Sequence, residues 1–363
     1  MKKTVSFALM ALVLAALALP VQVFANGEKE KAAGAGKNIT IVFVPKITGN
    51  AFFETANDGA QARSKTWGFT VKYDGSPEAA VANQVTVIRN AIRQGANGIS
   101  VSSLDATALD GVLKEAMATG MAVTTWDSDV SGDARTVMVS QGTPDILGKM
   151  LVDMGVKSLQ GRGKNPDTDT IRYAWHYSQS TVADQNSWRV AGEAYIKQKY
   201  PKWVNVRPDN YYSNQDAELA VSTGEAILKA NANIDLIICN DSTALPGQLQ
   251  AAQTLGYDKS KVTITGFATP NSIKPYARAG ILERWGLWDS GLQGALGVYF
   301  AYYLASGNQV KVGDKVNVPG IGEVEVLPNT VLDPAAYTAP NSGVVLLPER
   351  AEFTTANMDN YNF

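Results

Sequence analysis

The feature that most constrains the fold is the alternation of short apolar runs with helix-length segments, which begins near residue 39. The first apolar run, Ile39–Val44, is rich in β-branched residues and ends at Pro45. A segment of helical length follows over residues 50–67, and the same order then repeats. Strands that alternate with helices of this length predict an α/β fold, with parallel sheets covered by helices on both faces.

Helical periodicity is clear after residue 80. Four apolar residues from Val81 to Ile92 are spaced four, three and four residues apart, which places them on one helix face. Ser76 and Pro77 come shortly before this stripe. Because serine caps helices and proline is accepted in the first turn, we expect this helix to start there.

The remaining pattern predicts two similar lobes. Further strands are expected at 69–73, 98–101, 121–126, 137–140, 170–177, 204–207, 234–239, 262–266, 282–288 and 344–347. Further helices are expected at 106–119, 144–159, 182–198, 215–230, 244–255, 273–279 and 292–304, and a hairpin at 315–326. The strand–helix order restarts near residue 137, and we expect the chain to cross between lobes near Ser140, Asp289 and Leu347. The N-terminal lobe would contain 39–140 plus 290–346, and the C-terminal lobe 141–289 plus 347–363.

The first 25 residues have the pattern of a cleavable signal peptide. Met1–Lys3 is positively charged, residues 5–19 are almost wholly apolar, and Val23–Ala25 fits a cleavage site. We expect cleavage after Ala25, a flexible leader over 26–38, and export to a periplasm. The apolar run is shorter than the roughly 20 residues that a membrane-spanning helix needs.

Composition and missing motifs narrow the function classes. The net charge of −2 does not favour nucleic-acid binding, which depends on a basic surface. One cysteine and one histidine exclude an internal disulfide and argue against cysteine-cluster and two-histidine metal centres. The sequence contains no phosphate-binding loop and no nucleophile elbow, so neither a cofactor nor a metal is expected.

Polar side chains collect directly after the predicted strands. In open parallel sheets, ligands bind beyond the carboxyl ends of the strands. Carboxylates accept hydrogen bonds from hydroxyl groups and lysine donates them, so these residues favour a small polyhydroxylated ligand in a cleft between lobes. The polar residues at these places are Lys46, Asp74, Asp105 and Asp127 in the first half of the chain and Asp184, Gln185, Asn240, Asp241, Ser242 and Thr269 in the second. The candidate cleft walls are Phe52, Phe53, Trp288 and Asp289.

Some of these residues also fit other roles. Asp184 stands at a helix start and could be a cap. Phe52 and Phe53 could belong to the core. Asp127 and Asp184 could also form the carboxylate pair of a glycosidase, although that interpretation leaves the two-lobe design unexplained.

Six segments carry a resemblance to a known family: 43–46 (FVPK), 125–129 (TWDSD), 141–144 (QGTP), 181–186 (TVADQN), 286–289 (GLWD) and 346–350 (LLPER). Over 39–363 the chain resembles the periplasmic sugar-binding proteins of ABC importers that have the ribose-binding-protein-like fold. Within them it is most similar to the autoinducer-2-binding proteins of Lsr importers. The resemblance implies two Rossmann-like lobes joined by a three-segment hinge (periplasmic binding protein type I).

The resemblance also implies site residues and a role. Lys46, Asp127, Asp184 and Gln185 match ligand-contacting positions of the family in residue type. Two further positions depart, because the family has a proline and an alanine that present main-chain groups where this chain has Asn240 and Ser242. Both new side chains bring hydrogen-bonding groups into the cleft.

Three functions follow as hypotheses. The first is a periplasmic receptor that binds autoinducer-2 and delivers it to an inner-membrane ABC permease, as a monomer and without enzymatic activity. The second is a receptor for a pentose or deoxyhexose such as ribose or rhamnose, which Asn240 and Ser242 favour. The third is a secreted carbohydrate-active enzyme, which the absence of a complete catalytic motif disfavours.

Overall fold

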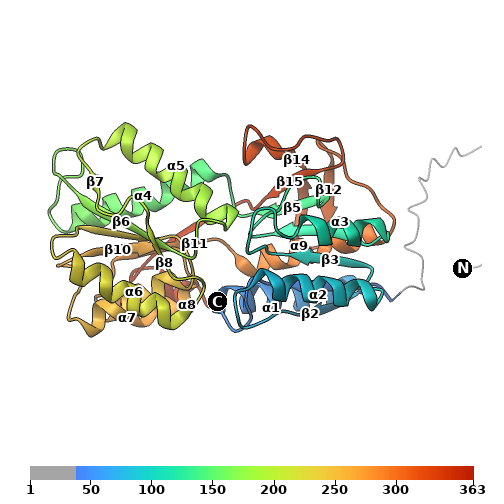
Figure 1. The fold of residues 1–363 in the computed structure, drawn as a ribbon, viewed down its shortest axis with the longest axis horizontal. Helices are drawn as coiled ribbons and strands as arrows, with labels where there is room; N and C mark the ends of the chain where they lie inside the picture. The colour runs from blue at the N-terminus through green and yellow to red at the C-terminus, as the bar shows by residue number, and fades with distance from the viewer. Residues whose placement is uncertain (1–37) are drawn as a thin grey trace, which may run out of the picture. The chain divides into compact units, whose positions relative to one another are not determined.

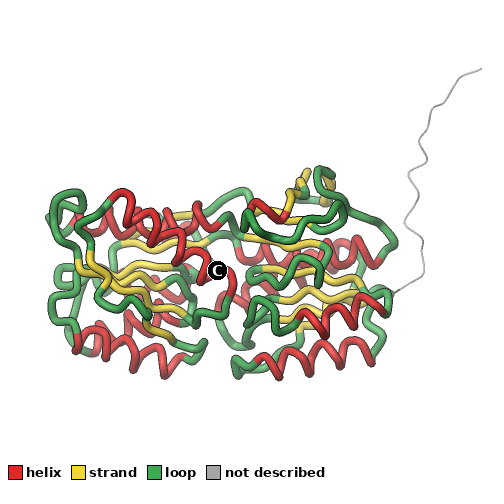
Figure 2. The backbone as a smooth tube through the Cα atoms, turned by 45° about the horizontal axis from the view of Figure 1, so that its top comes forward, coloured by secondary structure: helices red, strands yellow, loops and turns green. Residues whose placement is uncertain are grey.

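Two separate sheets organise the protein. The structure is a computed structural model that describes residues 38–363; the expected signal peptide and all but the last residue of the expected leader lie outside the described residues. Figure 1 shows the elements, and Figure 2 shows the two sheets as separate groups of strands, each flanked by helices. We call the two sheets with their helices the first lobe and the second lobe. This arrangement confirms the predicted α/β class.

The sheet of the first lobe has seven strands. In spatial order they are β14 (Leu327–Pro328), β15 (Gly343–Leu346), β5 (Val137–Ser140), β4 (Ala122–Trp126), β3 (Gly98–Val101), β1 (Thr40–Val44) and β2 (Thr70–Tyr73). All neighbours are parallel except β14, which is antiparallel to β15. Helices α1 (Ala51–Trp67) and α9 (Ser290–Ala305) pack on one face, and α2 (Val81–Arg93) and α3 (Asp110–Ala118) on the other. A hairpin of β12 (Lys315–Val318) and β13 (Gly322–Glu325) lies where the sequence predicts one.

The sheet of the second lobe has five strands. They are β10 (Thr263–Gly266), β9 (Leu236–Cys239), β6 (Arg172–Tyr177) and β7 (Val204–Asn205), with β8 (Tyr211–Tyr212) also paired to β6. All of these pairs are parallel. Helices α4 (Pro144–Gly161) and α5 (Ala183–Lys199) cover one face, and α6 (Ala217–Ala230) and α7 (Ala244–Thr254) cover the other, with α8 (Pro270–Arg278) against α7.

The chain passes from one sheet to the other three times. It leaves the first sheet after Ser140, returns after β11 (Arg284–Leu287), and leaves again after Leu346. The last segment then forms β16 (Ala351–Thr354), which pairs with β11 in an antiparallel ribbon. Three connecting segments therefore join the lobes. The exact residue bounds given above for each lobe stay a prediction.

Several predicted bounds are wrong for local reasons. Helix α2 begins at Val81 rather than at Ser76, because the Glu78 carbonyl accepts from the Ala80 amide two residues on, which makes a tight turn instead of a helical turn. Helix α3 begins at Asp110 rather than at residue 106: the Asp105 carboxylate accepts from the amides of Thr107 and Ala108, but this forms a separate turn that closes with the bond from the Asp110 amide to the Thr107 carbonyl. The short strands β8, β14 and β16 were not predicted.

The core is continuous from the first lobe into the second. One hydrophobic cluster lies between the first sheet and α2 and α3. The larger cluster covers the other face of that sheet and extends through the second lobe. Aromatic rings make the connection. The ring centroid of Phe52 lies 6.3 Å from that of Trp126 in the first lobe and 5.8 Å from that of Trp288. The ring centroid of Trp288 lies 5.4 Å from that of Phe267 in the second lobe. Within residues 38–363, no helix combines the length and apolarity that a bilayer crossing requires.

Helices α1 and α9 cross so closely that their backbones are in contact. A β-carbon added to Gly294 of α9 would lie 2.0 Å from the carbonyl oxygen of Ala56, and one added to Gly59 of α1 would lie 2.1 Å from that of Gly291. Such a crossing requires residues without side chains, because backbone atoms cannot yield. Helix α9 also packs against β3 and β4 of the first sheet, and its start follows directly on the second crossing between lobes.

Gly294→Ala should therefore lower the free energy of unfolding, by about 1–3 kcal/mol as is usual for overpacked cores. Urea denaturation followed by circular dichroism measures the change. Gly111→Ala is the matched control, because Gly111 is exposed in helix α3 and an added β-carbon meets no described atom within 4 Å. That variant should gain about 0.5–1 kcal/mol from helix propensity. Equal stability of the two variants would contradict the backbone contact.

Candidate ligand-binding site

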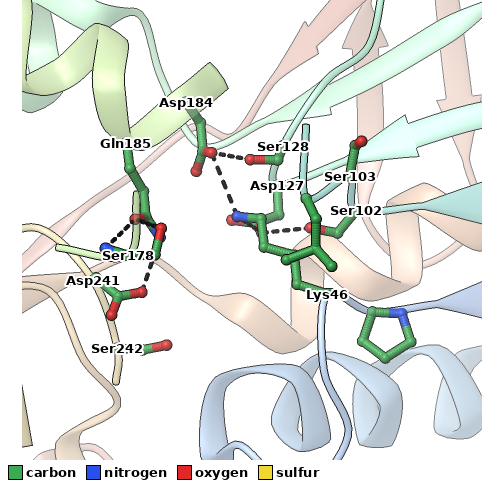
Figure 3. Close-up of polar contacts among 12 residues, drawn as sticks. Lys46, Ser102, Ser103, Asp127, Ser128, Ser178, Asp184, Gln185, Asp241 and Ser242 are labelled. Carbon is green, nitrogen blue, oxygen red and sulfur yellow. Dashed lines mark hydrogen bonds and ion pairs between the residues drawn. The ribbon is translucent and has the colours of Figure 1, made fainter. Parts of the chain in front are cut away.

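All six predicted ligand-binding residues line one small cavity between the lobes. Its volume is about 20 Å³, room for a single water molecule, so side chains must separate to admit a sugar-sized ligand. The complete lining is Lys46, Phe52, Phe53, Asp127, Asp184, Gln185, Trp188, Asn240, Asp241, Ser242, Phe267, Leu287 and Trp288. Figure 3 shows the polar members, which come from the ends of strands and the starts of helices in both lobes.

Lys46 is the cation of the site. It follows β1, and only 2% of its surface is exposed. Its ammonium group lies 2.9 Å from Asp127 of the first lobe and 3.4 Å from Asp184 of the second. Burial disfavours the charge, but the attraction of Asp127 and then Asp184 outweighs it, so the pKa of Lys46 is raised above its ordinary value. Lys46 therefore stays charged and connects the two lobes.

Asp127 occupies a strained position at the end of β4. Its φ angle is +61°, a left-handed conformation that is uncommon for residues other than glycine and that recurs at functional sites. The carboxylate accepts hydrogen bonds from Lys46 at 2.9 Å and from the Ser102 hydroxyl at 2.6 Å, both on the same oxygen. The backbone amide of Asp127 donates to Val139 of β5. The turn thus holds the carboxylate beside the Lys46 ammonium.

Asp184 belongs to the first turn of α5 and meets the first lobe. Its carboxylate accepts hydrogen bonds from Lys46 and from the Ser128 hydroxyl, both on the first-lobe side. Burial raises the pKa of Asp184; Lys46 opposes the shift and Asp127 reinforces it, and the result is a pKa of about 7. The N-cap of α5 is Val182, so Asp184 is not the cap that its position also allowed.

The two positions that depart from the family pattern lie after β9. The Asn240 side chain donates to the main-chain oxygen of Gln185 at 2.7 Å, while its own Oδ1 is buried and has no hydrogen-bond partner among residues 38–363. The Ser242 hydroxyl donates across the lobes to Oδ1 of Asn50 at 3.2 Å, and Asn50 donates to Thr243 at the same distance. Asn240 thus offers an acceptor to the cavity, and Ser242 joins the lobes at its rim.

The aromatic candidates for the cleft wall line the small cavity, and Asp289 does not. Phe52, Phe53 and Trp288 line the cavity. The indole of Trp288 donates to Gln293 at 2.6 Å, which fixes the ring. Asp289 is exposed and caps α9 by accepting from the Leu292 amide at 2.8 Å, and it lies outside this cavity. A helix that begins three residues after the end of a strand needs a cap at this place, and aspartate supplies it.

Asp241 also lines the cavity. It is one of the polar residues that follow predicted strands, although it is not among the six predicted ligand-binding residues; Asp74, Asp105 and Thr269 of the same group lie outside the cavity. Trp188, Phe267 and Leu287 complete the apolar lining. No group of three or more histidine, cysteine, aspartate or glutamate side chains in 38–363 is arranged to hold a metal ion.

A second, larger cavity adjoins the site. Its volume is about 380 Å³, and it shares Asp127, Asp184 and Trp188 with the small cavity. Its other walls come from the first-lobe loops around Asp129 and Tyr337 and from the start of α5. The two site carboxylates therefore border both cavities.

The comparison with known proteins identifies the family. The model of a periplasmic binding protein domain matches residues 41–309. The chain belongs to the periplasmic binding protein family. Members of this family bind solutes, which agrees with a cavity that holds hydrogen-bonding side chains between two lobes.

Solved structures of the family extend the comparison. LsrB from Clostridium saccharobutylicum, in complex with AI-2 (autoinducer-2), is 62% identical, with a TM-score of 0.89 over 90% of this chain and 100% of that chain. An ABC transporter solute-binding protein from Clostridium phytofermentas with bound L-rhamnose is 21% identical, with a TM-score of 0.78 over 90% and 98%. One from Burkholderia graminis in complex with D-arabinose is 20% identical, with a TM-score of 0.70 over 90% and 99%. The last two show a shared fold.

The raised pKa of Asp184 predicts a pH-dependent stability. Between about pH 4 and pH 7, the folded protein holds a proton on Asp184 that the unfolded chain has lost, so the free energy of unfolding falls as the pH rises. One group can contribute at most about 1.4 kcal/mol per pH unit. Asp184→Asn should remove this component, and denaturant titrations of both ligand-free proteins from pH 4.5 to 7.5 measure it. Parallel pH profiles would contradict the assignment.

Proposed function

We propose that this chain is the periplasmic receptor of an ABC importer, and that it binds AI-2 in the interlobe cavity and delivers it to a permease in the inner membrane. The observation that carries the proposal is that Lys46, Asp127, Asp184 and Gln185 meet in one buried cavity. The 62% identity to a protein solved with AI-2 supports the ligand.

The chemistry of the cavity suits a ligand with several hydroxyl groups. Asp127, Asp184 and the free Oδ1 of Asn240 are acceptors, so they take hydrogen bonds from hydroxyl donors. Lys46 uses two of its three N–H bonds on Asp127 and Asp184, which leaves one for a ligand oxygen. Phe52, Phe53 and Trp288 cover the C–H faces of a ring.

Binding between the lobes explains how the receptor signals occupancy. A ligand that touches Asp127 of the first lobe and Asp184 of the second stabilises the closed arrangement, because only that arrangement satisfies both sets of bonds. The three connecting segments act as the hinge. We take the lobes as 39–140 with 290–346 and 141–289 with 347–363, and the permease recognises the closed form.

The remaining parts of the proposal concern the whole chain. We infer that the protein is exported by the segment 1–25, works as a monomer in the periplasm and catalyses no reaction. Membership of a family of solute-binding proteins supports the last point.

A second ligand class has its own support. The buried Oδ1 of Asn240 has no partner within 38–363, and it adds a hydrogen-bond acceptor that a proline at this position would lack. An unpaired buried acceptor costs about 1–3 kcal/mol, so a ligand hydroxyl that pairs with it gains affinity. A pentose or a deoxyhexose such as ribose or rhamnose offers hydroxyl groups for this purpose.

The ligand itself is the first measurement. Small molecules released by denaturing the purified protein are identified by mass spectrometry and tested in a luminescent autoinducer-2 reporter assay. Reporter activity is expected. A pentose or deoxyhexose mass without reporter activity would assign the receptor to a sugar importer instead.

Asp127→Ala should weaken AI-2 binding by roughly 10- to 150-fold, because a hydrogen bond to a charged group contributes about 1.5–3 kcal/mol. Isothermal titration calorimetry measures it, with circular dichroism to check the fold. Asp127→Asn should also weaken binding. Asp74→Ala is the control, since Asp74 follows β2 of the same sheet but lies outside the cavity. Unchanged affinity in both Asp127 variants would refute the site.

A further inference from the structure

We propose that Asp241 is a positioning residue that locks the side-chain amide of Gln185, so that Gln185 can only donate a hydrogen bond to the ligand. This inference rests on the proposed function, since it assigns a specificity rule to the same site. It is carried by the hydrogen bonds at both ends of the Gln185 amide.

The Asp241 carboxylate is fixed by its own lobe. It follows β9, and only 2% of the residue is exposed. Its Oδ1 accepts from the backbone amides of Thr243 at 3.1 Å and Ala244 at 2.7 Å and from the hydroxyl of Ser213 at 3.2 Å. Three donors on one oxygen leave the carboxylate no freedom to rotate.

The other oxygen of Asp241 orients two glutamines. Its Oδ2 accepts from Nε2 of Gln185 at 2.9 Å and from Nε2 of Gln215 at 3.0 Å. A carboxylate has no proton to donate, so each glutamine must turn its NH₂ group toward it. The nitrogen and oxygen of a glutamine amide are assigned from such hydrogen-bond partners, and here the carboxylate partner requires nitrogen.

The opposite end of the Gln185 amide is occupied as well. Its Oε1 accepts from the Ser178 hydroxyl at 2.5 Å and from the Ser178 backbone amide at 3.2 Å, which uses both lone pairs. The side chain of Asn240 also holds the main-chain oxygen of Gln185 at 2.7 Å. Figure 3 shows Gln185 between Ser178 and Asp241. Of its hydrogen-bonding groups, one N–H remains without an acceptor in the described residues.

The backbone conformation around Gln215 supports the role of Asp241 as a fixed acceptor. Asn214 and Gln215 both have left-handed φ angles, +51° and +61°. Two neighbouring non-glycine residues in this region are held there only by surrounding contacts. The bond of Gln215 to Asp241 is one such contact.

The lock sets a rule for the ligand. The atom that faces Gln185 must carry a lone pair, as a ring oxygen, a carbonyl oxygen or a hydroxyl oxygen does. An ammonium group there would set donor against donor, so an aminated sugar is rejected at this position. Asp127 and Asp184 impose the opposite requirement, because they accept hydrogen bonds. The site therefore distinguishes ligands by the direction of their hydrogen bonds.

Asp241→Asn tests the lock. The new amide can accept from the helix start with its oxygen, but its NH₂ group then opposes those of Gln185 and Gln215. AI-2 affinity, measured by isothermal titration calorimetry, should fall about 10- to 100-fold. Asp235→Asn is the matched control, since Asp235 is a buried aspartate at the other end of β9 and pairs with Lys164. Its affinity should be unchanged.

A double-mutant cycle separates positioning from a general structural role. If Asp241 acts through Gln185, Asp241→Asn should reduce affinity only slightly further in a Gln185→Ala background. If Asp241→Asn lowers the affinity by the same factor in the unmutated protein and in Gln185→Ala, the proposal is overturned. Ser178→Ala loosens the amide from its other end and keeps the test valid if Asp241→Asn does not fold; it should weaken binding in the Gln185 protein and not in Gln185→Ala.

A readout without ligand distinguishes failure of the lock from failure of the proposed function. In ¹⁵N NMR spectra of the ligand-free protein, the Gln185 side-chain NH₂ signals, assigned by their loss in Gln185→Ala, should exchange slowly with solvent. They should exchange fast in Asp241→Asn and slowly in Asp235→Asn. Fast exchange in the unmutated protein would overturn the lock. Slow exchange in a protein that binds neither AI-2 nor L-rhamnose would uphold the lock and refute the receptor assignment.

Discussion

The placement of one buried cation determines how the two lobes meet. Lys46 belongs to the first lobe, and its ammonium group lies between Asp127 of the same lobe and Asp184 of the other. A buried charge is strongly unfavourable unless it is paired. If the lobes separate, the Lys46 ammonium group and the Asp184 carboxylate lose their ion pair, and water must solvate both charges. Ligand hydroxyls that insert here exchange one set of charged hydrogen bonds for another. The same ion pairs can thus favour closure and still yield to a ligand.

The apolar surroundings make this arrangement possible. The rings of Phe52, Trp126, Trp288 and Phe267 form a continuous path from one lobe to the other beside the charged groups. They exclude water, which strengthens each hydrogen bond and raises the cost of leaving one unmade. Burial is also what raises the pKa of Asp184. Polar recognition and the apolar contact between lobes therefore depend on each other.

Much of the site could be read from the residues because the fold places the carboxyl ends of parallel strands together. Lys46, Asp127 and Asn240 follow apolar strands, and all of them line the cavity. Asp289 fulfilled the same criterion and is nevertheless a helix cap, because a polar residue after a strand serves equally well to start the next helix. Position after a strand therefore limits the set of candidate binding residues, but it does not identify which of them line the cavity.

The sequence by itself determined the α/β class, most of the strands and helices, and the set of polar residues from which the site is built, since these follow from local periodicity and residue type. Only the tertiary structure decided which of those residues meet. The pairing of Lys46 with Asp184 and the lock of Gln185 by Asp241 join residues 138 and 56 positions apart. Hydrogen-bond direction depends on partners brought together by folding, and no local pattern records it.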